Sequence, residues 1–157
     1  YHVPGRTGRG IDVDTVVRLA EHPHVAALKE AGGSVDRVSQ IVRRCELDVL
    51  SGDDALTWPM MSVGALGVIS VAANVIPAEM TRMVHAALEG QWDEALEYHL
   101  KYHGLFGDLF LDTNPIPVKA ALAMMGLLEE VYRLPLCEMA EDKKERLSAG
   151  LRGLGLL

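Results

Sequence analysis

Short apolar runs alternate with amphipathic segments along the first half of the chain. Apolar residues recur at helical spacing over 13–20, and Asp12 directly before them is a suitable N-cap. The uncharged run Val25–Leu28 follows, between Pro23 and a pair of glycines, which is typical of a buried parallel strand. This cycle of helix, loop and strand predicts βαβ units and a parallel sheet.

The cycle repeats twice more before residue 75. Ser34 can cap a helix whose apolar face extends from Val38 to Cys45, and Val49-Leu50 forms the centre of a second strand. A further helix, opened by two aspartates, is expected over 53–63, and a third strand over Gly67–Val71.

The second half of the chain is predicted to be helical throughout. Four helical segments are expected near Pro77, Trp92, Pro115 and Leu147. Three strands and one strand end at Tyr1 are few for an open sheet with so many helices. The pattern therefore predicts an α/β fold, with the later half of a (β/α)8 barrel over 1–75, and the last barrel helix plus a carboxy-terminal helical region over 76–157. The start at Tyr1, without an initiator methionine, is expected for a chain that lacks the earlier strands.

Charge and composition exclude several classes of function. The 157 residues carry a net charge of −7 without a basic cluster, which argues against nucleic acid and anionic membrane partners. The uncharged stretch 55–78 is interrupted by prolines and glycines, so a buried helix and strand explain it better than a membrane span. The sequence opens without a signal-peptide pattern, and Cys45 and Cys137, outside any CxxC motif, are expected to be buried thiols in a reducing cytosol. We therefore expect a cytoplasmic protein.

Candidate catalytic residues lie at the carboxyl ends of the expected strands, where (β/α)8 barrels carry their active sites. Lys29 ends an apolar run, and desolvation there favours the neutral amine, which can attack a ketone and form a Schiff base. Tyr1 can relay protons, and Arg6, after a turn at Val3-Pro4-Gly5, can bind a carboxylate. The alternatives are a lysine that reaches solvent, a packed aromatic ring and a solvated arginine.

Other polar groups have simpler explanations. Asp53 and Asp54 precede a helix, so capping explains them better than catalysis. His99 and His103 have the i, i+4 spacing of zinc ligands, but neither an HExxH motif nor a third ligand accompanies them. The glycines form no GxGxxG fingerprint after a strand, and no GxSxG motif is present. No metal or nucleotide site is therefore expected.

Five segments resemble the dihydrodipicolinate synthase family, in the family's order and spacing. They are Tyr1–Gly8, similar to YNVPxRTG; Leu28–Ala31, similar to the Schiff-base lysine segment; Leu50–Asp54, similar to the SGDD turn; Gly67–Asn74, similar to GVISVTAN; and Asn114–Lys119, similar to NPIPVK. Each motif alone is weak, but together they extend over almost the whole chain.

The resemblance implies a lyase that condenses pyruvate with aspartate 4-semialdehyde to 4-hydroxy-tetrahydrodipicolinate, on the route to diaminopimelate and lysine. Lys29 would form the imine with pyruvate, and Tyr1 would relay protons. Arg6 would bind the carboxylate of the second substrate. The carbonyl of Ile69 and the turn at Gly52 would contribute to substrate binding. The resemblance implies no metal or organic cofactor, because the imine is the electron sink, and it implies a homotetramer.

Two departures from the family pattern have consequences. His2 stands where the family usually has Asn, so the support of Tyr1 is expected to differ. The family's first strands, with a GTTGE turn, a threonine and a second tyrosine of the proton relay, and the lysine-feedback site, have no counterpart in residues 1–157. The chain is therefore not expected to catalyse the reaction alone.

Related functions stay open at this point. N-acetylneuraminate lyase and the keto-deoxy-sugar acid aldolases share the imine lysine, although Arg6 favours a substrate with a carboxylate. A non-catalytic half-barrel that serves as an assembly partner is an alternative of a different class.

Overall fold

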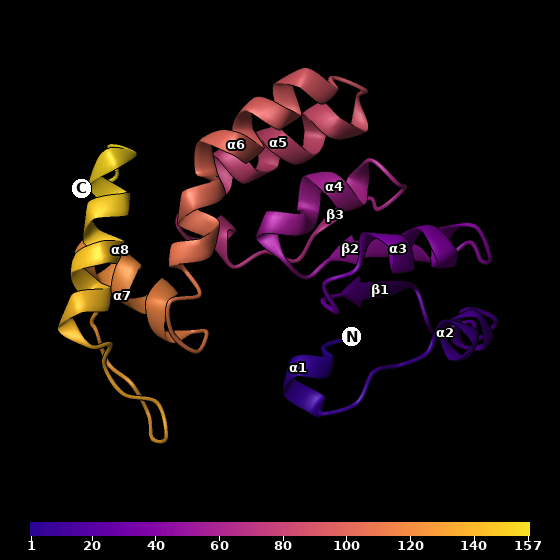
Figure 1. Ribbon diagram of the computed structural model, residues 1–157, viewed down its shortest axis with the longest axis horizontal. Helices are drawn as coiled ribbons and strands as arrows, with labels where there is room; N and C mark the ends of the chain where they lie inside the picture. Colours follow the sequence, from indigo (N-terminus) through magenta and orange to yellow (C-terminus); the bar gives the residue numbers. More distant parts are fainter.

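The computed structural model describes residues 1–157 and has a parallel sheet at one end of an elongated molecule (Figure 1). The strands lie in the order β1 (Ala27–Glu30), β2 (Asp48–Ser51) and β3 (Gly67–Val68). The start of the chain extends the sheet at the β1 edge, where His2 forms a parallel bridge with Glu30. The predicted α/β fold with a parallel sheet is confirmed.

Helices follow each strand and predominate in the second half of the chain, where the segment between residues 124 and 141 is not helical. In the first half they are α1 (Pro4–Thr7), α2 (Val13–Ala20), α3 (Val35–Val42), the 3-10 turn η1 (Asp54–Leu56), α4 (Thr57–Met61) and the 3-10 turn η2 (Ala72–Asn74). In the second half they are α5 (Pro77–Leu88), α6 (Trp92–Asp108), α7 (Ile116–Met124) and α8 (Glu141–Gly153). The segment that the sequence suggests as one helix over 53–63 is thus divided, and the expected turn at Val3-Pro4-Gly5 belongs to α1. None of the helices is both long and apolar enough to span a membrane.

Two predicted helix caps are confirmed by their hydrogen bonds. The Asp12 carboxylate accepts from the Thr15 N–H at 2.8 Å at the start of α2, and the Ser34 hydroxyl accepts from the Arg37 N–H at 3.1 Å at the start of α3. Each bond satisfies an N–H group that the first helical turn would otherwise leave without a partner.

Two strands differ from the sequence prediction in their limits. The run at Val25 does not begin β1, because the Val25 N–H closes a turn onto the His22 carbonyl and pairing with β2 starts at Ala27. The third strand ends at Val68 rather than at 71, because the Asp54 carboxylate binds the backbone N–H groups that follow and directs the chain into η2.

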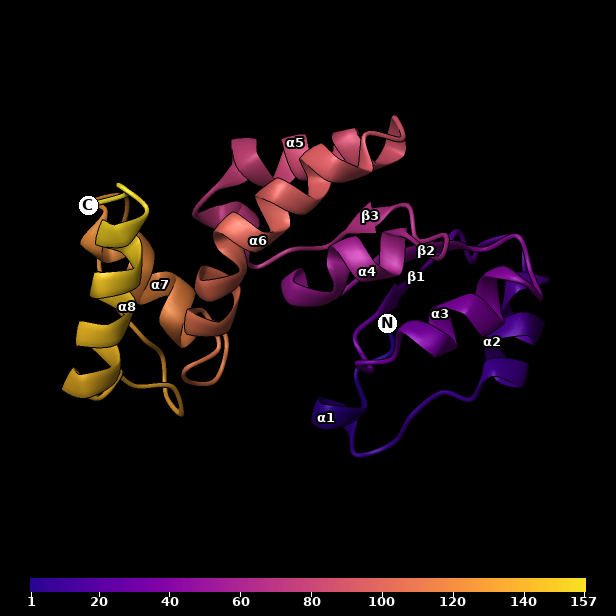
Figure 2. The same cartoon turned by 45° about the horizontal axis from the view of Figure 1, so that its top comes forward.

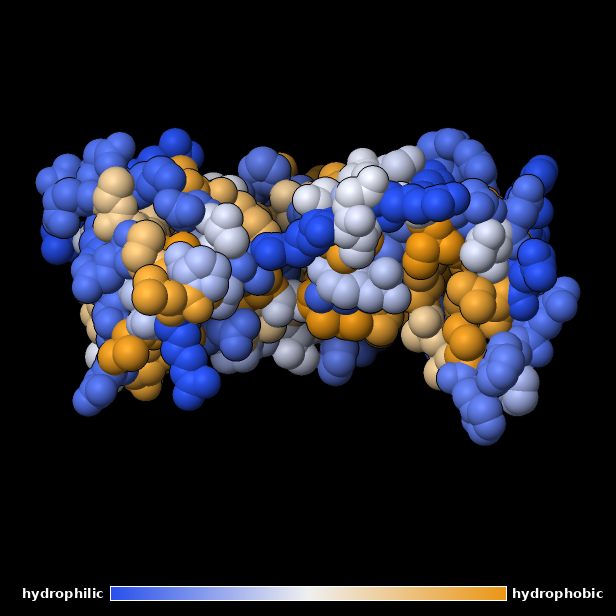
Figure 3. Space-filling model, turned by 90° about the horizontal axis from the view of Figure 1, so that it is seen from below, coloured by the Kyte–Doolittle hydropathy of each residue, from blue (hydrophilic) through white to orange (hydrophobic).

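The sheet is covered on one face only. Leu28, Glu30, Val49 and Ser51 are buried toward the helices, whereas the alternate residues Ala27, Lys29, Asp48 and Leu50 are exposed or half-buried. Helices α4, α5 and α6 lie above the strands in Figure 1, and the view from below shows hydrophobic patches among hydrophilic ones on the uncovered side (Figure 3). The strands that the sequence predicts as buried are therefore buried on one face.

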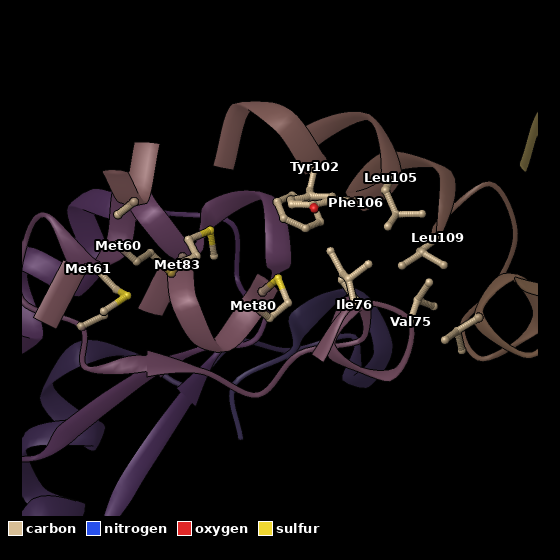
Figure 4. Packing of buried hydrophobic residues seen from close by; sticks show 14 of the residues in the cluster. Met60, Met61, Val75, Ile76, Met80, Met83, Tyr102, Leu105, Phe106 and Leu109 are labelled. Carbon is tan, nitrogen blue, oxygen red and sulfur yellow. The ribbon is translucent and has the colours of Figure 1, made fainter. Parts of the chain in front are cut away.

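The main core lies where α5 and α6 pack together and onto α4 and η2. Along this seam the buried methionines Met60 and Met83 lie at one end and Phe106 and Leu109 at the other, with Met80 between them (Figure 4). Burying a side chain of this size contributes about 1.5–3 kcal/mol relative to leaving it in water. These methionines are thus part of the hydrophobic core.

Helices α7 and α8 form a lobe at the end of the molecule farthest from α2 (Figures 1 and 2). Leu147 and Leu151 bury one face of α8, and an ion pair of 2.9 Å from Arg146 Nε to Asp108 Oδ1 joins α8 to α6. Of the two free thiols, Cys45 is half-buried and Cys137 is exposed, so the prediction of two buried cysteines is wrong.

Candidate active site

Tyr1 and Lys29 lie side by side on the open face of the sheet. The His2 N–H donates to the Lys29 carbonyl at 2.9 Å, and the Ala31 N–H donates to the His2 carbonyl at 2.9 Å. This parallel pairing puts the residue before His2 next to the residue before Glu30, on the same face. The Lys29 Nζ consequently lies 4.3 Å from the centroid of the Tyr1 ring, which is 60% exposed.

A pocket of about 390 Å³ opens beside the Lys29 side chain. Its walls come from the loop after β3 and from the start of α7. Its lining residues are Lys29, Ile69, Ser70, Val71, Asn74, Asn114, Pro115, Val118, Lys119 and Leu122. The structure therefore brings Lys29 and Ile69 together, as predicted, and adds polar groups from Asn114 and Lys119, which the sequence analysis quoted only as part of a motif.

Gly52 leaves room for the Lys29 side chain at the end of β2. A Cβ atom at position 52 would lie 2.7 Å from the Cβ of Ala31 and 3.0 Å from the Cε of Lys29. The Gly52 N–H also donates to the Glu30 carbonyl at 2.7 Å, which continues the pairing of β1 with β2. Glycine is needed here for close approach, since any larger residue would displace the lysine.

Arg6 lies near this pocket without lining it. Helix α1 carries the Arg6 side chain toward the segment before α7, where its guanidinium donates to the Asn114 carbonyl at 3.3 Å. Asn114 itself lines the pocket, so Arg6 is one contact away from the pocket. Its exposed guanidinium keeps donors free for a carboxylate.

Asp54 has a different role from the capping that the sequence suggests. Asp53 caps η1 by accepting from the Ala55 N–H, but the Asp54 carboxylate is 1% exposed and accepts from the N–H groups of Val71 and Ala72 at 3.1 and 2.9 Å. Burial raises the pKa of Asp54, and its hydrogen bonds oppose that rise only in part. Asp54 thus ties the start of η1 to the loop that carries Ile69.

A buried charged network lies behind the pair of Tyr1 and Lys29. His2 Nδ1 is 2.6 Å from Glu30 Oε1, the Gly32 N–H donates to the same oxygen at 2.7 Å, and Arg37 Nε donates to Oε2 at 2.9 Å. Glu30 is fully buried. The motifs of the sequence did not predict this network. Its one signal in the sequence is that Glu30 directly follows Lys29 in a strand and therefore faces the opposite side, toward the helices.

The two candidate zinc ligands lie far along the chain from this pocket, on α6. The rings of His99 and His103 are 5.4 Å apart between centroids, and no third His, Cys, Asp or Glu joins them. Burial against Trp58 and Phe106 lowers the pKa of His99, with a smaller contribution from His103. The two histidines belong to an aromatic cluster between α4 and α6.

Comparisons with known proteins agree with the motifs at this pocket. The model of the dihydrodipicolinate synthetase family matches residues 1–153. The 4-hydroxy-tetrahydrodipicolinate synthase of Pelobacter propionicus is 46% identical over 159 aligned residues, which cover 100% of this chain and 55% of that protein.

Solved structures give the same result. The crystal structure of dihydrodipicolinate synthase from Aquifex aeolicus is 48% identical with a TM-score of 0.97, and the match covers 99% of this chain and 54% of that one. The chloride-inhibited enzyme from Acinetobacter baumannii, complexed with pyruvate, is 40% identical with a TM-score of 0.97, covering 100% and 55%. The chain spans about half the length of the curated relatives it matches.

Proposed function

The chain belongs to the dihydrodipicolinate synthetase family, and on this premise we propose that the protein carrying it condenses pyruvate with aspartate 4-semialdehyde to 4-hydroxy-tetrahydrodipicolinate. The product would feed the synthesis of diaminopimelate and lysine. One observation carries the proposal: the Lys29 Nζ lies 4.3 Å from the Tyr1 ring centroid and opens onto a pocket that Ile69 also lines. A primary amine can form an imine with a ketone, and a phenol beside it can relay the protons of that reaction.

In the proposed reaction the Lys29 amine attacks the keto carbon of pyruvate, and loss of water gives the imine. Tyr1 accepts a proton from the amine and donates one to the hydroxyl group that leaves as water. Deprotonation of the methyl group then gives an enamine, whose carbon attacks the aldehyde of the second substrate and leaves a hydroxyl group there. The amino group of the second substrate then attacks the imine carbon, which closes the ring, breaks the bond to the lysine nitrogen and releases the Lys29 amine. The imine itself is the electron sink, so the proposal invokes neither a metal nor an organic cofactor.

The remaining site residues have binding roles in this proposal. The Arg6 guanidinium would bind the carboxylate of aspartate 4-semialdehyde by two parallel hydrogen bonds. The Ile69 carbonyl would contact the pyruvate end of the imine, and Gly52 would keep the passage for the lysine side chain clear. The free donors of Arg6 and the position of Ile69 at the pocket support these roles.

The open face of the sheet supports a further part of the proposal. We propose that residues 1–75 form the later half of a (β/α)8 barrel and that residues 76–157 form its last helix and a carboxy-terminal helical region. Lys29 would then point into the barrel interior at the carboxyl ends of the strands, where such enzymes have their active sites. The span of about half the relatives' length agrees with this arrangement.

The proposal extends to location and assembly. We propose a cytoplasmic homotetramer that acts on these two small molecules and has no nucleic acid or membrane partner. The net charge of −7 without a basic cluster supports the absence of such partners. Sedimentation of the complete protein would test the tetramer.

Trapping the imine tests the chemistry. The complete protein is incubated with pyruvate, reduced with borohydride and digested, and the peptide containing Lys29 is analysed by mass spectrometry. We expect a covalent pyruvate adduct on Lys29 and none in the Lys29→Ala variant. Lys119, which lines the same pocket, is the matched control and should stay unmodified. A folded protein without an adduct at Lys29 would contradict the proposal.

A further inference from the structure

Each of the two proposed catalytic residues is followed in the chain by one member of a buried pair. Tyr1 precedes His2, and Lys29 precedes Glu30. Because neighbouring residues of a strand point to opposite faces, Tyr1 and Lys29 share the open face, while His2 and Glu30 share the face toward α3.

The Glu30 carboxylate is satisfied by three donors from three different segments. These are the His2 ring at the start of the chain, the Gly32 N–H in the loop after β1, and Arg37 on α3. A buried carboxylate accepts hydrogen bonds only, so His2 must carry its proton on Nδ1. Charge-assisted bonds of this kind are the strong ones, and a buried carboxylate that loses a donor is costly.

The space around the pair is closed. A Cβ atom at Gly32 would lie 2.4 Å from His2 Cε1 and 2.7 Å from Glu30 Oε1, and one at Gly10 would lie 3.2 Å from His2 Nε2. The imidazole is only 6% exposed. The ring therefore has little freedom to leave Glu30 while the backbone around it keeps its path.

This bond fixes how the start of the chain lies against β1. The segment before α1 is held to β1 by a single bridge, with two backbone hydrogen bonds around His2. A shift of one residue would turn Tyr1 to the opposite face, away from Lys29. The side-chain bond to Glu30 opposes such a shift, because only residue 2 can supply the donor.

We propose that His2 and Glu30 are positioning residues, whose hydrogen bond holds the Tyr1 phenol beside the Lys29 amine from the opposite face of the sheet. Neither touches the substrate. The inference rests on the proposed function and goes beyond it, because it means that residues on the face toward α3 affect the rate of imine formation. Arg37 supports the pair by balancing the charge of Glu30.

The test measures the rate constant of imine formation at saturating pyruvate in the complete protein, by borohydride quench and mass spectrometry. His2→Leu removes the donor and is expected to slow the reaction about 10- to 100-fold, the cost of a misplacement of about 1 Å. His2→Asn, whose amide N–H can occupy the place of Nδ1, is expected to stay within about threefold of wild type. Glu30→Met, which removes the acceptor from a side chain of similar length, should lower the rate as His2→Leu does, with pyruvate affinity little changed.

A double variant and a surface control distinguish positioning from general stability. The His2→Leu, Glu30→Met double variant should be no slower than the slower single variant, because both changes remove the same bond. Arg44→Gln removes an exposed ion pair of 2.6 Å with Asp14 and should keep the wild-type rate. Thermal unfolding of each variant gives the folded fraction, by which each rate is corrected.

The outcomes separate the two proposals. If wild type forms the adduct and either His2→Leu or Glu30→Met forms it at the wild-type rate, the positioning inference is wrong and the proposed function stands. His2→Asn as slow as His2→Leu would also overturn the inference. If wild type forms no adduct at Lys29, the proposed function fails and the inference with it.

Discussion

The Lys29 side chain reaches its pocket because the residue beside it, Gly52, has no side chain of its own. Its amine lies against the exposed ring of Tyr1, while the neighbouring Glu30 is fully buried among donors. Two consecutive residues thus meet opposite environments, and the alternation of the strand is the reason. At this scale the reactive groups depend on small steric and hydrogen-bonding details of their neighbours.

Gly52→Ala should slow imine formation in the complete protein. The new methyl group would lie 3.0 Å from Lys29 Cε and 2.7 Å from Ala31 Cβ, so the lysine must move. We expect a decrease of at least about tenfold in the rate of trapping by borohydride. Gly104→Ala, on α6 with no atom within 4 Å of the new Cβ, is the control and should keep the rate. Equal rates for the two variants would refute the steric role of Gly52.

Near this pocket, a side chain binds backbone N–H groups that no neighbouring strand pairs with. The strand β3 is short, and its continuation is held by the Asp54 carboxylate at the start of η1 rather than by a sheet. One oxygen, Asp54 Oδ1, is buried without a partner. The charged form of this carboxyl is therefore incompletely compensated, which agrees with the raised pKa of Asp54.

The stability of the complete protein should depend on pH through Asp54. Burial raises its pKa in the folded state above the ordinary value of 3.8, so the folded state binds the proton more tightly than the unfolded state does. The contribution of Asp54 to stability should accordingly decrease as the pH rises from about 3.8 through the higher folded pKa.

Asp54→Asn cannot ionise and keeps an oxygen for the N–H groups of Val71 and Ala72. We expect it to remove this decrease and to raise the thermal midpoint at neutral pH by about 2–4 °C. Asp54→Ala, which leaves both N–H groups unpaired, should lower the midpoint at every pH. Asp36→Asn, on the exposed face of α3, controls for loss of a carboxylate. An Asp54→Asn profile parallel to wild type would show that the titration of Asp54 does not matter.

The whole molecule has a sheet with helices on one face and solvent on the other. Tyr1 and Ile69, at 60% and 46% exposure, stand on the uncovered side together with half-buried Lys29 and Leu50. Uncovered apolar sheet faces and unpaired strand edges favour association with further chains. The proposed barrel would cover this face with other strands.

Residues 1–157, produced alone, should therefore self-associate and bind a hydrophobic dye more strongly than the complete protein does. Sedimentation velocity over a range of concentrations and dye fluorescence would measure the two effects. Leu50→Asp should reduce both self-association and dye binding, since it places a charge on the open face. A chain that stays monomeric and binds no dye would argue that this face needs no cover.

Local signals in the sequence, namely helix caps and the periodicity of apolar residues, determine much of the secondary structure. The caps at Asp12 and Ser34, the alternation of helix and strand, and the helical second half follow from hydrogen-bonding side chains and periodicity, which act within a few residues. The motif segments also marked Lys29, Ile69 and the region around Asn114, which the structure brings to one pocket. Their assigned roles in substrate binding stay predictions.

Only the tertiary structure decided what depends on contacts between distant segments. One example is the bond between His2 and Glu30, which are far apart in the sequence. Another is Asp54, which binds the backbone after β3 and so determines where that strand ends. Burial of a glutamate costs free energy unless donors from other elements reach it, and no local pattern shows that they do. The sequence by itself thus determined the elements and the candidate lysine, whereas packing determined which polar groups surround that lysine and which face of its strand stays open.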